Sequence, residues 1–324
     1  MMIRRIRVVF QVPMFAVAAV AVLLFVGTAP AMAAVCGPDV DEARWQTAQV
    51  EGTPARLRDY LTACPKGRHA GQARARLARV SEPWEPEMVA VRGRCFQMGS
   101  DKNDAAREKD ERQHEVCIKD FEIARHEVTF DEYDRFVAAT GREPPYDEGW
   151  GRGRQPVINV TWEDATAYAT WLGRTTGRPY RLPTEAEWEF ACRSGGQSQR
   201  YCGAERANPY GCYADNCRGR AHLVGSRPAN GLGIHDMSGN VGEWTCSIYD
   251  PRYRGSETRC AKVSEPGSRV GRGGSWLDAE EYLRAASRDG GHTKFRAITL
   301  GFRLAGDVEP CLRMAGKPPV GGSC

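Results

Sequence analysis

Twelve cysteines constrain this 324-residue chain more than any other feature of its sequence. All of them follow Val35, their number is even, and none belongs to a Cys-x-x-Cys motif. In an exported protein an even set of cysteines predicts disulfides, whereas a reduced cytosolic chain would bury free thiols or place them in a zinc site. The interpretation of the cysteines therefore depends on whether the chain leaves the cytosol.

The N-terminus predicts that it does. Three arginines within the first seven residues precede an apolar run over residues 8–26, and the small residues Ala31 and Ala33 follow. A basic start, an apolar middle and a small-x-small end are typical of a secretory signal peptide, here residues 1–33. An uncleaved membrane anchor is the alternative, because the run is almost long enough to span a bilayer. We expect cleavage after Ala33 and a periplasmic or secreted protein with no stable membrane span.

The net charge argues against one large class of partner. Without the three leader arginines the chain holds 42 basic and 41 acidic side chains, so its charge is near neutral. Proteins that bind nucleic acids or other polyanions usually carry a strongly basic surface. The charge balance therefore gives no support to nucleic-acid binding.

Residues 34–82 predict a short helical segment. The apolar residues with helical spacing are Leu57, Tyr60, Leu61 and Cys64. The segment resembles one unit of a tetratricopeptide-like helical hairpin, which buries little surface when it stands alone. We expect it to pack on the main domain or to bind a partner, and we expect a Cys36–Cys64 disulfide to join its ends.

Residues 83–308 predict a large domain of short strands, short helices and many Gly and Pro turns, with a tail over residues 309–324. Residues 95–99 and 114–118 alternate like strands, so Cys95 and Cys117 fit a disulfide across an antiparallel pair. A Cys246–Cys260 disulfide would close the loop between these two residues. The partners of the remaining cysteines stay open at this stage: Cys192, Cys202, Cys212, Cys217, Cys311 and Cys324, of which the last two can close the tail.

Three helix starts share one capping device. In each, a threonine is followed three residues later by an acid: Thr129 with Glu132, Thr161 with Asp164, and Thr184 with Glu187. The hydroxyl and the carboxylate each accept a hydrogen bond from a backbone N–H that the first helical turn leaves free. We therefore expect helices to begin directly after these three threonines.

Eight segments of the large domain occur in an order that points to a known family. They are Phe96–Ser100, Glu127–Thr129, Pro156–Trp162, Arg181–Ala191, Asn230–Thr245, Arg272–Trp276, Arg284–Arg288 and Gly301–Arg303. Together they resemble the formylglycine-generating enzyme family, also called the sulfatase-modifying factors, over about residues 85–305. The resemblance implies an α+β fold of the C-type-lectin-like kind with little regular secondary structure.

The resemblance also bears on oxidative chemistry. In formylglycine-generating enzymes, two cysteines shortly after the Gly-Gly-Ser-aromatic segment bind copper(I) and act in oxidising a substrate cysteine with molecular oxygen. Thiolates are the soft ligands that copper(I) prefers. Here Asp278 takes the first of these positions, and the second falls at or near Leu283. The sequence therefore argues against copper and against formylglycine formation by the copper mechanism.

Other branches of the family act as non-haem iron oxidases or keep the fold as a binding module. The residues that would offer hard donors for iron here are Asp278, Glu280, Glu281 and His292. They lack the His-x-Asp/Glu spacing of a facial triad, and acids scattered near a loop are more often solvated. An iron site is therefore the weaker of the metal hypotheses.

Calcium is the metal that the resemblance favours. In the family, the Gly-Asn-x-x-Glu-Trp segment holds a calcium ion through backbone carbonyls and the glutamate. The matching residues are Ser238, Gly239 and Val241 through their backbone oxygens and Glu243 through its carboxylate. Calcium prefers ligand sets made only of oxygen. The alternative is that Glu243 caps a turn or pairs with an arginine.

Two functions follow from this sequence. The first is an atypical oxidoreductase that modifies a peptide or a peptide-derived metabolite, and the second is a non-catalytic module that binds a protein, a peptide or a peptide-derived small molecule. The candidate pocket residues are Ser275, Trp276, Asp278, Arg284 and Arg288. Because a fold does not establish a reaction, the choice depends on how these residues meet in space.

Overall fold

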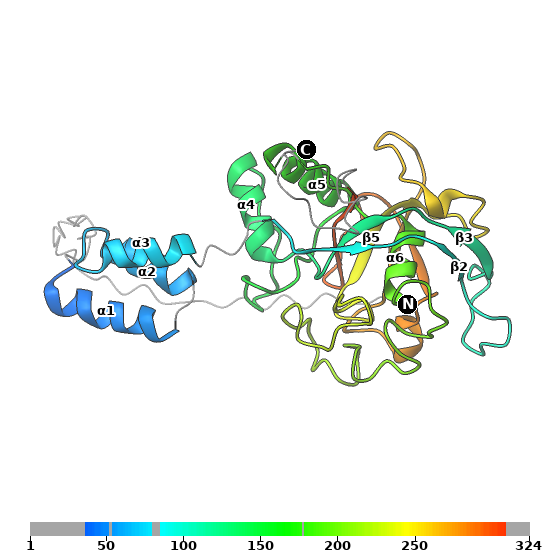
Figure 1. Cartoon of the computed structure of the whole chain (residues 1–324), viewed down its shortest axis with the longest axis horizontal. Helices are drawn as coiled ribbons and strands as arrows, with labels where there is room; N and C mark the ends of the chain where they lie inside the picture. The colour runs from blue at the N-terminus through cyan, green and yellow to red at the C-terminus, as the bar shows by residue number, and fades with distance from the viewer. Residues whose placement is uncertain (1–35, 52–53, 80–84, 177, 309–324) are drawn as a thin grey trace, which may run out of the picture. The chain divides into compact units, whose positions relative to one another are not determined.

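The computed structural model describes residues 36–51, 54–79, 85–176 and 178–308. The chain divides into two compact units with the boundary between Glu82 and Pro83 (Figure 1). The predicted signal peptide and the tail cysteines Cys311 and Cys324 lie outside the described residues. Within the described ranges, no helix is both long enough and apolar enough to cross a membrane.

The small unit consists of three helices, α1 (Pro38–Glu51), α2 (Pro54–Ala63) and α3 (Ala70–Arg79). The face of α2 that the sequence marks as apolar is packed, because Leu57 and Tyr60 are buried together with Cys64 just beyond the helix. A Cys36–Cys64 disulfide joins the two ends of the α1–α2 pair. Helices of this length are marginal on their own, so the disulfide and the small apolar core between the helices stabilise them.

The strands of the large unit form three sheets among the described residues. In hydrogen-bonded order they are β1 (Met88–Val91), β4 (Phe121–Ala124) and β9 (Ala305–Asp307); β2 (Cys95–Met98) and β3 (His114–Cys117); and β7 (Arg288–Gly291), β6 (Arg269–Arg272), β5 (Gly242–Ile248) and β8 (Leu300–Phe302). In the third sheet β5 pairs with β6 antiparallel and with β8 in parallel, and β6 pairs with β7 antiparallel. This architecture confirms the predicted α+β fold with little regular secondary structure.

The helices of the large unit begin where the threonine caps predict. They are α4 (Phe130–Thr140), α5 (Trp162–Thr176) and α6 (Glu185–Cys192), with short 3-10 turns at η1 (Ser256–Thr258) and η2 (Glu280–Leu283). The cap hydroxyls of Thr129, Thr161 and Thr184 accept hydrogen bonds from the third helical N–H at 3.3, 3.0 and 3.2 Å. The acid at that position accepts the N–H of the cap residue in return. Each box satisfies two backbone groups that the helix end leaves free.

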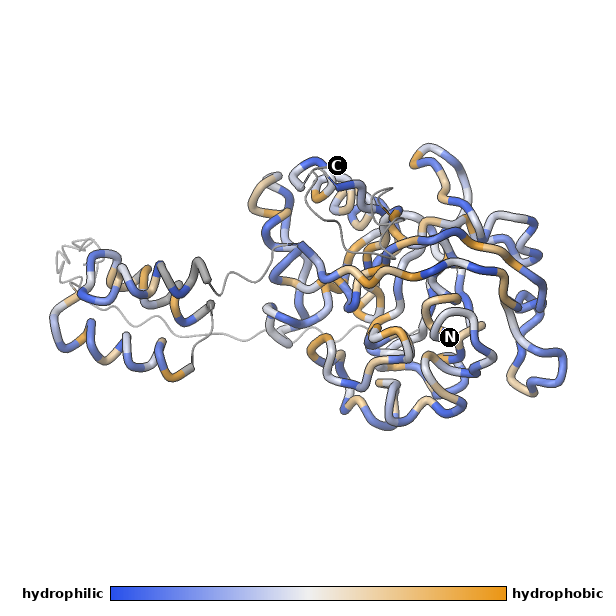
Figure 2. The backbone as a smooth tube through the Cα atoms, in the orientation of Figure 1, coloured by the Kyte–Doolittle hydropathy of each residue, from blue (hydrophilic) through white to orange (hydrophobic). Residues whose placement is uncertain are grey.

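Large aromatic side chains fill the core of this unit. Trp162, Tyr168 and Trp244 belong to one buried cluster with α4 and α5, and Trp188 and Phe190 of α6 belong to a second cluster. Figure 2 shows hydrophobic positions along the central strands, whereas the outer loops are mostly hydrophilic. Because rings of this size bury a large area each, a few of them can support a domain that is mainly loop.

Disulfides fasten the loops to this core. The predicted Cys95–Cys117 and Cys246–Cys260 bridges are present, and Cys95 lies opposite Cys117 in the β2–β3 register. The structure also supplies the pairs that the sequence left open, Cys192–Cys202 and Cys212–Cys217. All ten cysteines of the described residues are therefore in disulfides.

Candidate functional site

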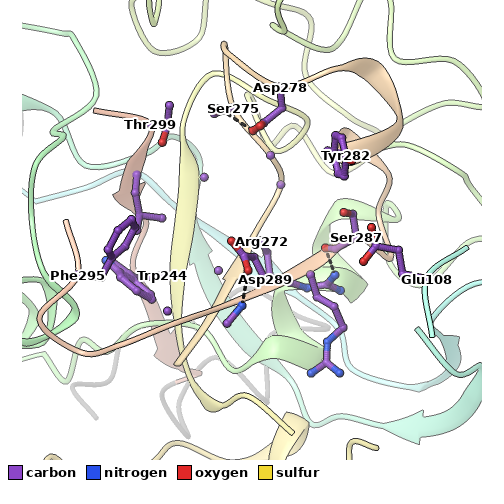
Figure 3. A pocket seen from close by; sticks show the side chains of 18 of the residues that line it. Glu108, Trp244, Arg272, Ser275, Asp278, Tyr282, Ser287, Asp289, Phe295 and Thr299 are labelled. Carbon is purple, nitrogen blue, oxygen red and sulfur yellow. Dashed lines mark hydrogen bonds between the residues drawn. The ribbon is translucent and has the colours of Figure 1, made fainter. Parts of the chain in front are cut away.

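One face of the third sheet borders an open cavity of about 560 Å³ (Figure 3). Six glycines line it: Gly242, Gly271, Gly273, Gly274, Gly290 and Gly291. Glycine contributes no side chain, so the backbone itself forms much of the wall. Concave sites with a few polar groups are the usual places for ligands, and this cavity is the candidate site of the chain.

Strand register explains the shape of the cavity floor. Gly271 on β6 is paired with Trp244 on β5 and with Asp289 on β7. Paired residues on neighbouring strands point to the same face, so the missing side chain of Gly271 leaves a gap beside Asp289. The Trp244 ring reaches across β6 to β7, where a Cβ atom on Gly291 would meet its Cη2 at 2.5 Å. A Cβ atom placed on Gly271 would meet only Leu300 Cδ1 within 4 Å, at 3.9 Å. The space above Gly271 is therefore open.

Ser275 and Asp278 are two of the three predicted pocket residues that line this cavity. The chain reaches them through Gly273 and Gly274, whose φ angles of 98° and 64° are left-handed and suit glycine. The Ser275 hydroxyl donates a hydrogen bond of 2.7 Å to Asp278 Oδ2. The tight turn thus places a linked hydroxyl and carboxylate at the cavity wall, as Figure 3 shows.

Trp276 and Arg284 do not line this cavity, although the sequence grouped them with Ser275. The Trp276 ring is buried in the core, where its Nε1 donates to the Ile298 carbonyl at 3.2 Å and its ring meets Trp150 edge-on. The Arg284 guanidinium donates two hydrogen bonds to the buried carboxylate of Glu111, at 2.7 and 2.8 Å. Both residues support the fold around the site from other directions.

A buried charged group lies beneath the cavity and is called the floor cluster below. It contains Arg193, Arg272 and Arg288 with Glu185 and Glu189, all at most 8% exposed. Arg288, the fifth predicted pocket residue, lines the cavity, yet its Nε and Nη2 donate to Glu185 at 2.7 and 2.6 Å. Arg272 donates to Glu189, which also accepts a 2.8 Å hydrogen bond from Arg193 Nε. The guanidiniums at the cavity floor are therefore already paired with carboxylates.

The pKa values of these carboxylates reflect the competition between burial and pairing. Burial raises the pKa of Glu185 in spite of Arg272 and Arg288 beside it. Burial acts the same way on Glu189, but Arg193 and Arg272 outweigh it and leave the pKa of Glu189 lowered. Neither glutamate was predicted as a site residue from the sequence, because acidic side chains on a helix are usually solvated. Their four-residue spacing on α6, which puts them on one helix face, was the available signal.

The copper site of the resembling enzymes does not fit the residues present. Every described cysteine is in a disulfide, and none of them lines the cavity. Leu283, which falls near the second copper position, is a buried apolar residue. Copper(I) prefers thiolates, and the wall offers the hard carboxylate of Asp278 instead.

The iron candidates do not converge either. Asp278 and His292 line the cavity, whereas Glu280 and Glu281 do not. In the part of the chain that the structure describes, groups of three donor residues close enough to hold a metal occur at Cys212, Cys217 and His222 and at Cys36, Asp41 and Cys64. Each of these groups contains a disulfide, whose sulfurs are not thiolate ligands.

The calcium candidates lie at a second buried charged group, called here the Arg303 cluster: Glu127, Asp236, Glu243 and Arg303. Glu243 pairs with an arginine, which was the alternative to calcium binding. Arg303 Nε and Nη2 each donate a hydrogen bond of 2.6 Å to its carboxylate. Of the predicted backbone ligands, the Ser238 carbonyl accepts the Cys212 N–H at 3.1 Å. Glu243 is therefore a poor calcium ligand in this arrangement.

The other two acids of the Arg303 cluster, Glu127 and Asp236, form no ion pair within the described residues. Glu127 is 1% exposed and its Oε2 has no hydrogen-bond partner, while Asp236 accepts the Gly225 N–H at 2.6 Å. Burial raises the pKa of both carboxyls, and Asp236 raises the pKa of Glu127 further. An orphaned buried carboxylate beside a second one fits an oxygen-binding cation such as calcium.

Comparisons with known proteins agree with this fold. The profile of the Sulfatase-modifying factor enzyme 1-like domain matches residues 74–308. The chain is 27% identical to the formylglycine-generating enzyme of Mus musculus, over 85% of this chain and 92% of that enzyme. It is 30% identical to the formylglycine-generating enzyme of Thermomonospora curvata, over 68% of this chain and 93% of that enzyme.

A solved structure supports the same assignment. The structure of PvdO from Pseudomonas aeruginosa superposes with a TM-score of 0.60 at 29% identity, over 70% of this chain and 96% of that chain. The similarity therefore extends from sequence motifs to the arrangement of the whole large unit. This chain belongs to the sulfatase-modifying factor family, the family of the formylglycine-generating enzymes.

Proposed function

We propose that this chain binds a peptide or a peptide-derived molecule in the cavity on the third sheet. The observation that carries the proposal is the glycine-lined floor, which leaves an open space above Gly271. A slot with backbone walls admits an extended chain closely, and Ser275 and Asp278 offer polar groups at its side. Because the floor cluster is already paired, the slot needs no rearrangement before it binds, which lowers the cost of binding.

Selection from a library of short random peptides displayed on phage tests this proposal. The mature protein should retain a defined set of peptides that the Gly271→Leu variant does not retain, since the new side chain fills the slot without meeting backbone. Gly71→Leu is the matched control, because a side chain there meets nothing within 4 Å in the small unit. Retention of the same peptides by Gly271→Leu, with its folding verified by circular dichroism, would contradict the proposal.

An atypical oxidoreductase acting on a peptide in the same cavity is the second candidate. Family membership and the Ser275–Asp278 hydrogen bond at the wall favour it. The test is mass spectrometry of the selected peptides after incubation with the protein in air, with and without added iron. A mass change that requires Ser275 or Asp278 would favour the enzyme, and unchanged peptides would favour the binding module.

We propose in addition that calcium binds the Arg303 cluster through Glu127 and Asp236. The support is the excess of three carboxylates over one guanidinium in a buried place, together with the orphaned Glu127 Oε2. Calcium would act there as a structural ion and not at the cavity, whose lining contains neither acid. Calorimetric titration with calcium, compared with Glu127→Gln, tests this assignment.

The compartment that we propose is the periplasm or the extracellular space. Five disulfides in the described residues support it, because disulfides persist in oxidising compartments. N-terminal sequencing of the protein from its native host should begin at Ala34. A mature N-terminus at Met1 would contradict the proposed cleavage.

A further inference from the structure

We infer that residues 249–258, called here the clasp loop, form a pH-dependent clasp on the floor cluster: contact between His114 and Glu257 holds the loop closed at acidic pH and releases it at alkaline pH. The inference concerns a motion of the protein itself, so it does not depend on the proposed ligand. It follows from the way the loop is fastened, from the polar atoms without partners at its end, and from the position of the proton on His114.

The clasp loop holds Arg288, whose side chain lines the cavity. Arg288 Nη1 donates a hydrogen bond of 2.9 Å to the carbonyl of Asp250. The guanidinium also lies over the rings of Tyr249 and Tyr253, at 5.0 and 4.0 Å from their centroids. Such contacts stabilise a cation most where water is excluded. The position of Arg288 beneath the cavity therefore depends in part on the loop staying in place.

The end of the clasp loop is fastened by a buried carboxylate. Glu257 of η1 is 4% exposed, and its Oε1 lies 3.5 Å from Nε2 of His114 on β3. Among the residues that the structure describes, His114 is the only side chain that forms an ion pair with Glu257. No hydrogen-bond partner is present there for Glu257 Oε2, His114 Nε2 or the hydroxyl of Tyr253. Buried polar groups without partners are costly, so this contact depends strongly on the attraction between its charges.

The proton on His114 determines whether the contact attracts or repels. His114 Nδ1 lies 2.9 Å from the Arg112 carbonyl, which can only accept, so Nδ1 carries a hydrogen. In the imidazolium, Nε2 carries a hydrogen as well and faces the Glu257 carboxylate with a positive charge. In the neutral ring, the same tautomer leaves a lone pair on Nε2 facing the carboxylate. Loss of one proton therefore turns an attractive contact into a repulsive one.

The other charged groups around His114 do not take the place of Glu257. Glu189 on α6 also acts on His114, but it is paired with two arginines of the floor cluster. Burial keeps the pKa of Tyr253 well above its usual value, so this phenol stays neutral. Arg288, which lies over Tyr253, is paired with a glutamate of the floor cluster. Because Glu257 raises the pKa of His114, the clasp is closed below that raised value and opens as the pH rises through it.

Hydrogen–deuterium exchange between pH 6 and pH 9 tests the inference, with each rate corrected for the intrinsic effect of pH on exchange. Protection of residues 249–258 in the mature protein should fall by about fivefold as the pH rises, the size expected for the loss of a partly exposed ion pair. The ring signals of His114, followed by NMR, should titrate with the same midpoint. Unchanged protection across this range would overturn the inference.

Two variants and a control assign the change to this pair. His114→Gln does not titrate, so its protection should show no step with pH. Glu257→Gln should also lose the step, because its amide can donate to the neutral ring. His69→Gln, which removes a histidine that pairs with the exposed Glu42 in the small unit, should keep it. A step that persists in His114→Gln would assign the motion to other groups and overturn the inference. If His114→Gln does not fold, Glu257→Gln gives the answer by the same measurement.

Discussion

The floor cluster and the Arg303 cluster both consist of buried arginines and carboxylates, but they differ in charge. The floor cluster has more guanidiniums than carboxylates, whereas the Arg303 cluster has more carboxylates than guanidiniums. In the floor cluster three guanidiniums face two carboxylates, and both glutamates accept charge-assisted hydrogen bonds. In the Arg303 cluster one guanidinium faces three carboxylates, and Glu127 Oε2 has no partner. Each guanidinium of the first cluster is paired with a carboxylate, although Arg272 Nε has no hydrogen-bond partner, and the cluster can hold a rigid binding floor. The second needs protons or a cation to balance its charge.

Breaking the floor cluster should have the largest effect on stability. Glu185→Gln keeps the shape of the side chain but leaves Arg288 and Arg272 facing a single carboxylate. We expect a loss of about 3–5 kcal/mol in the free energy of unfolding, because an uncompensated charge stays buried. Denaturant unfolding measures it. Arg254→Gln is the control, since it removes an exposed guanidinium that pairs with Asp250 and its cost should be much smaller. Similar small losses in both variants would show that the floor cluster is not tightly coupled.

The Arg303 cluster should respond in the opposite direction. Glu127→Gln removes a buried charge and keeps the oxygen that accepts the Asn240 amide at 2.9 Å. Without calcium, this variant should be more stable than the wild type at pH 7 by about 1–3 kcal/mol, because the raised pKa of Glu127 makes its ionisation costly in the folded state.

Added calcium should also distinguish the wild type from Glu127→Gln. Added calcium should raise the melting temperature of the wild type and should have little effect on Glu127→Gln, as differential scanning calorimetry can measure. A calcium response that is equal in both proteins would place the ion elsewhere. A wild type that is more stable than the variant without calcium would contradict the charge imbalance.

Acid should weaken the region next to the Arg303 cluster by a smaller amount. Burial, with His235, Arg303 and two further arginines nearby, lowers the pKa of His126 to about 3. The unfolded chain binds this proton near pH 6.5 and the folded chain does not, so stability is complete above pH 6.5 and declines as the pH falls toward 3. Partial exposure screens the effect, which should stay below about 1.4 kcal/mol per pH unit.

His126→Gln tests this assignment, because glutamine does not titrate. The variant should show a flatter decline of melting temperature between pH 6.5 and pH 5 than the wild type does. Parallel curves for the two proteins would assign the acid sensitivity to other groups. His114 provides a contrast: Glu257, whose carboxylate lies 3.5 Å from His114 Nε2, raises the pKa of His114. Its contribution to stability is therefore present at low pH and is lost as the pH rises through that raised value.

The smallest expected effect is on the reaction of the copper-dependent relatives. Incubation of the purified protein with copper and a Cys-x-Pro-x-Arg peptide should produce no aldehyde detectable by mass spectrometry. The reason is that the cavity wall offers Asp278 where a thiolate is needed, and the described cysteines are held in disulfides. Turnover of the peptide would restore the ordinary reaction of the family to this chain.

The sequence predicted the local parts of the fold better than the site. Helix starts at Thr129, Thr161 and Thr184 and the Cys95–Cys117 bridge were predictable, because capping and strand alternation act over a few residues. Ser275 and Asp278 were found because they sit in a motif. Trp276 was assigned wrongly to the pocket wall, since adjacent residues in a turn point in different directions and its ring enters the core.

The remaining features depend on contacts between distant segments. Glu185 of α6 meets Arg288 of β7 across 103 residues, and Glu243 meets Arg303 across 60. The gap at Gly271 exists only because β5 and β7 flank β6 in a particular register. A glycine in a strand indicates a bulge or a close approach when it is considered alone. The open space that Gly271 leaves beside Asp289 can be recognised only in the assembled sheet.

Hydrogen–deuterium exchange with a bound peptide tests the central claim most directly. Peptides retained in the phage selection are added to the mature protein, and exchange is measured along the whole chain. The account predicts slower exchange in β6 (Arg269–Arg272) and β7 (Arg288–Gly291), and no change in the β1–β4–β9 sheet, which contributes no residue to the cavity. Protection confined to the small helical unit, with β6 and β7 unchanged, would contradict the cavity as the binding site.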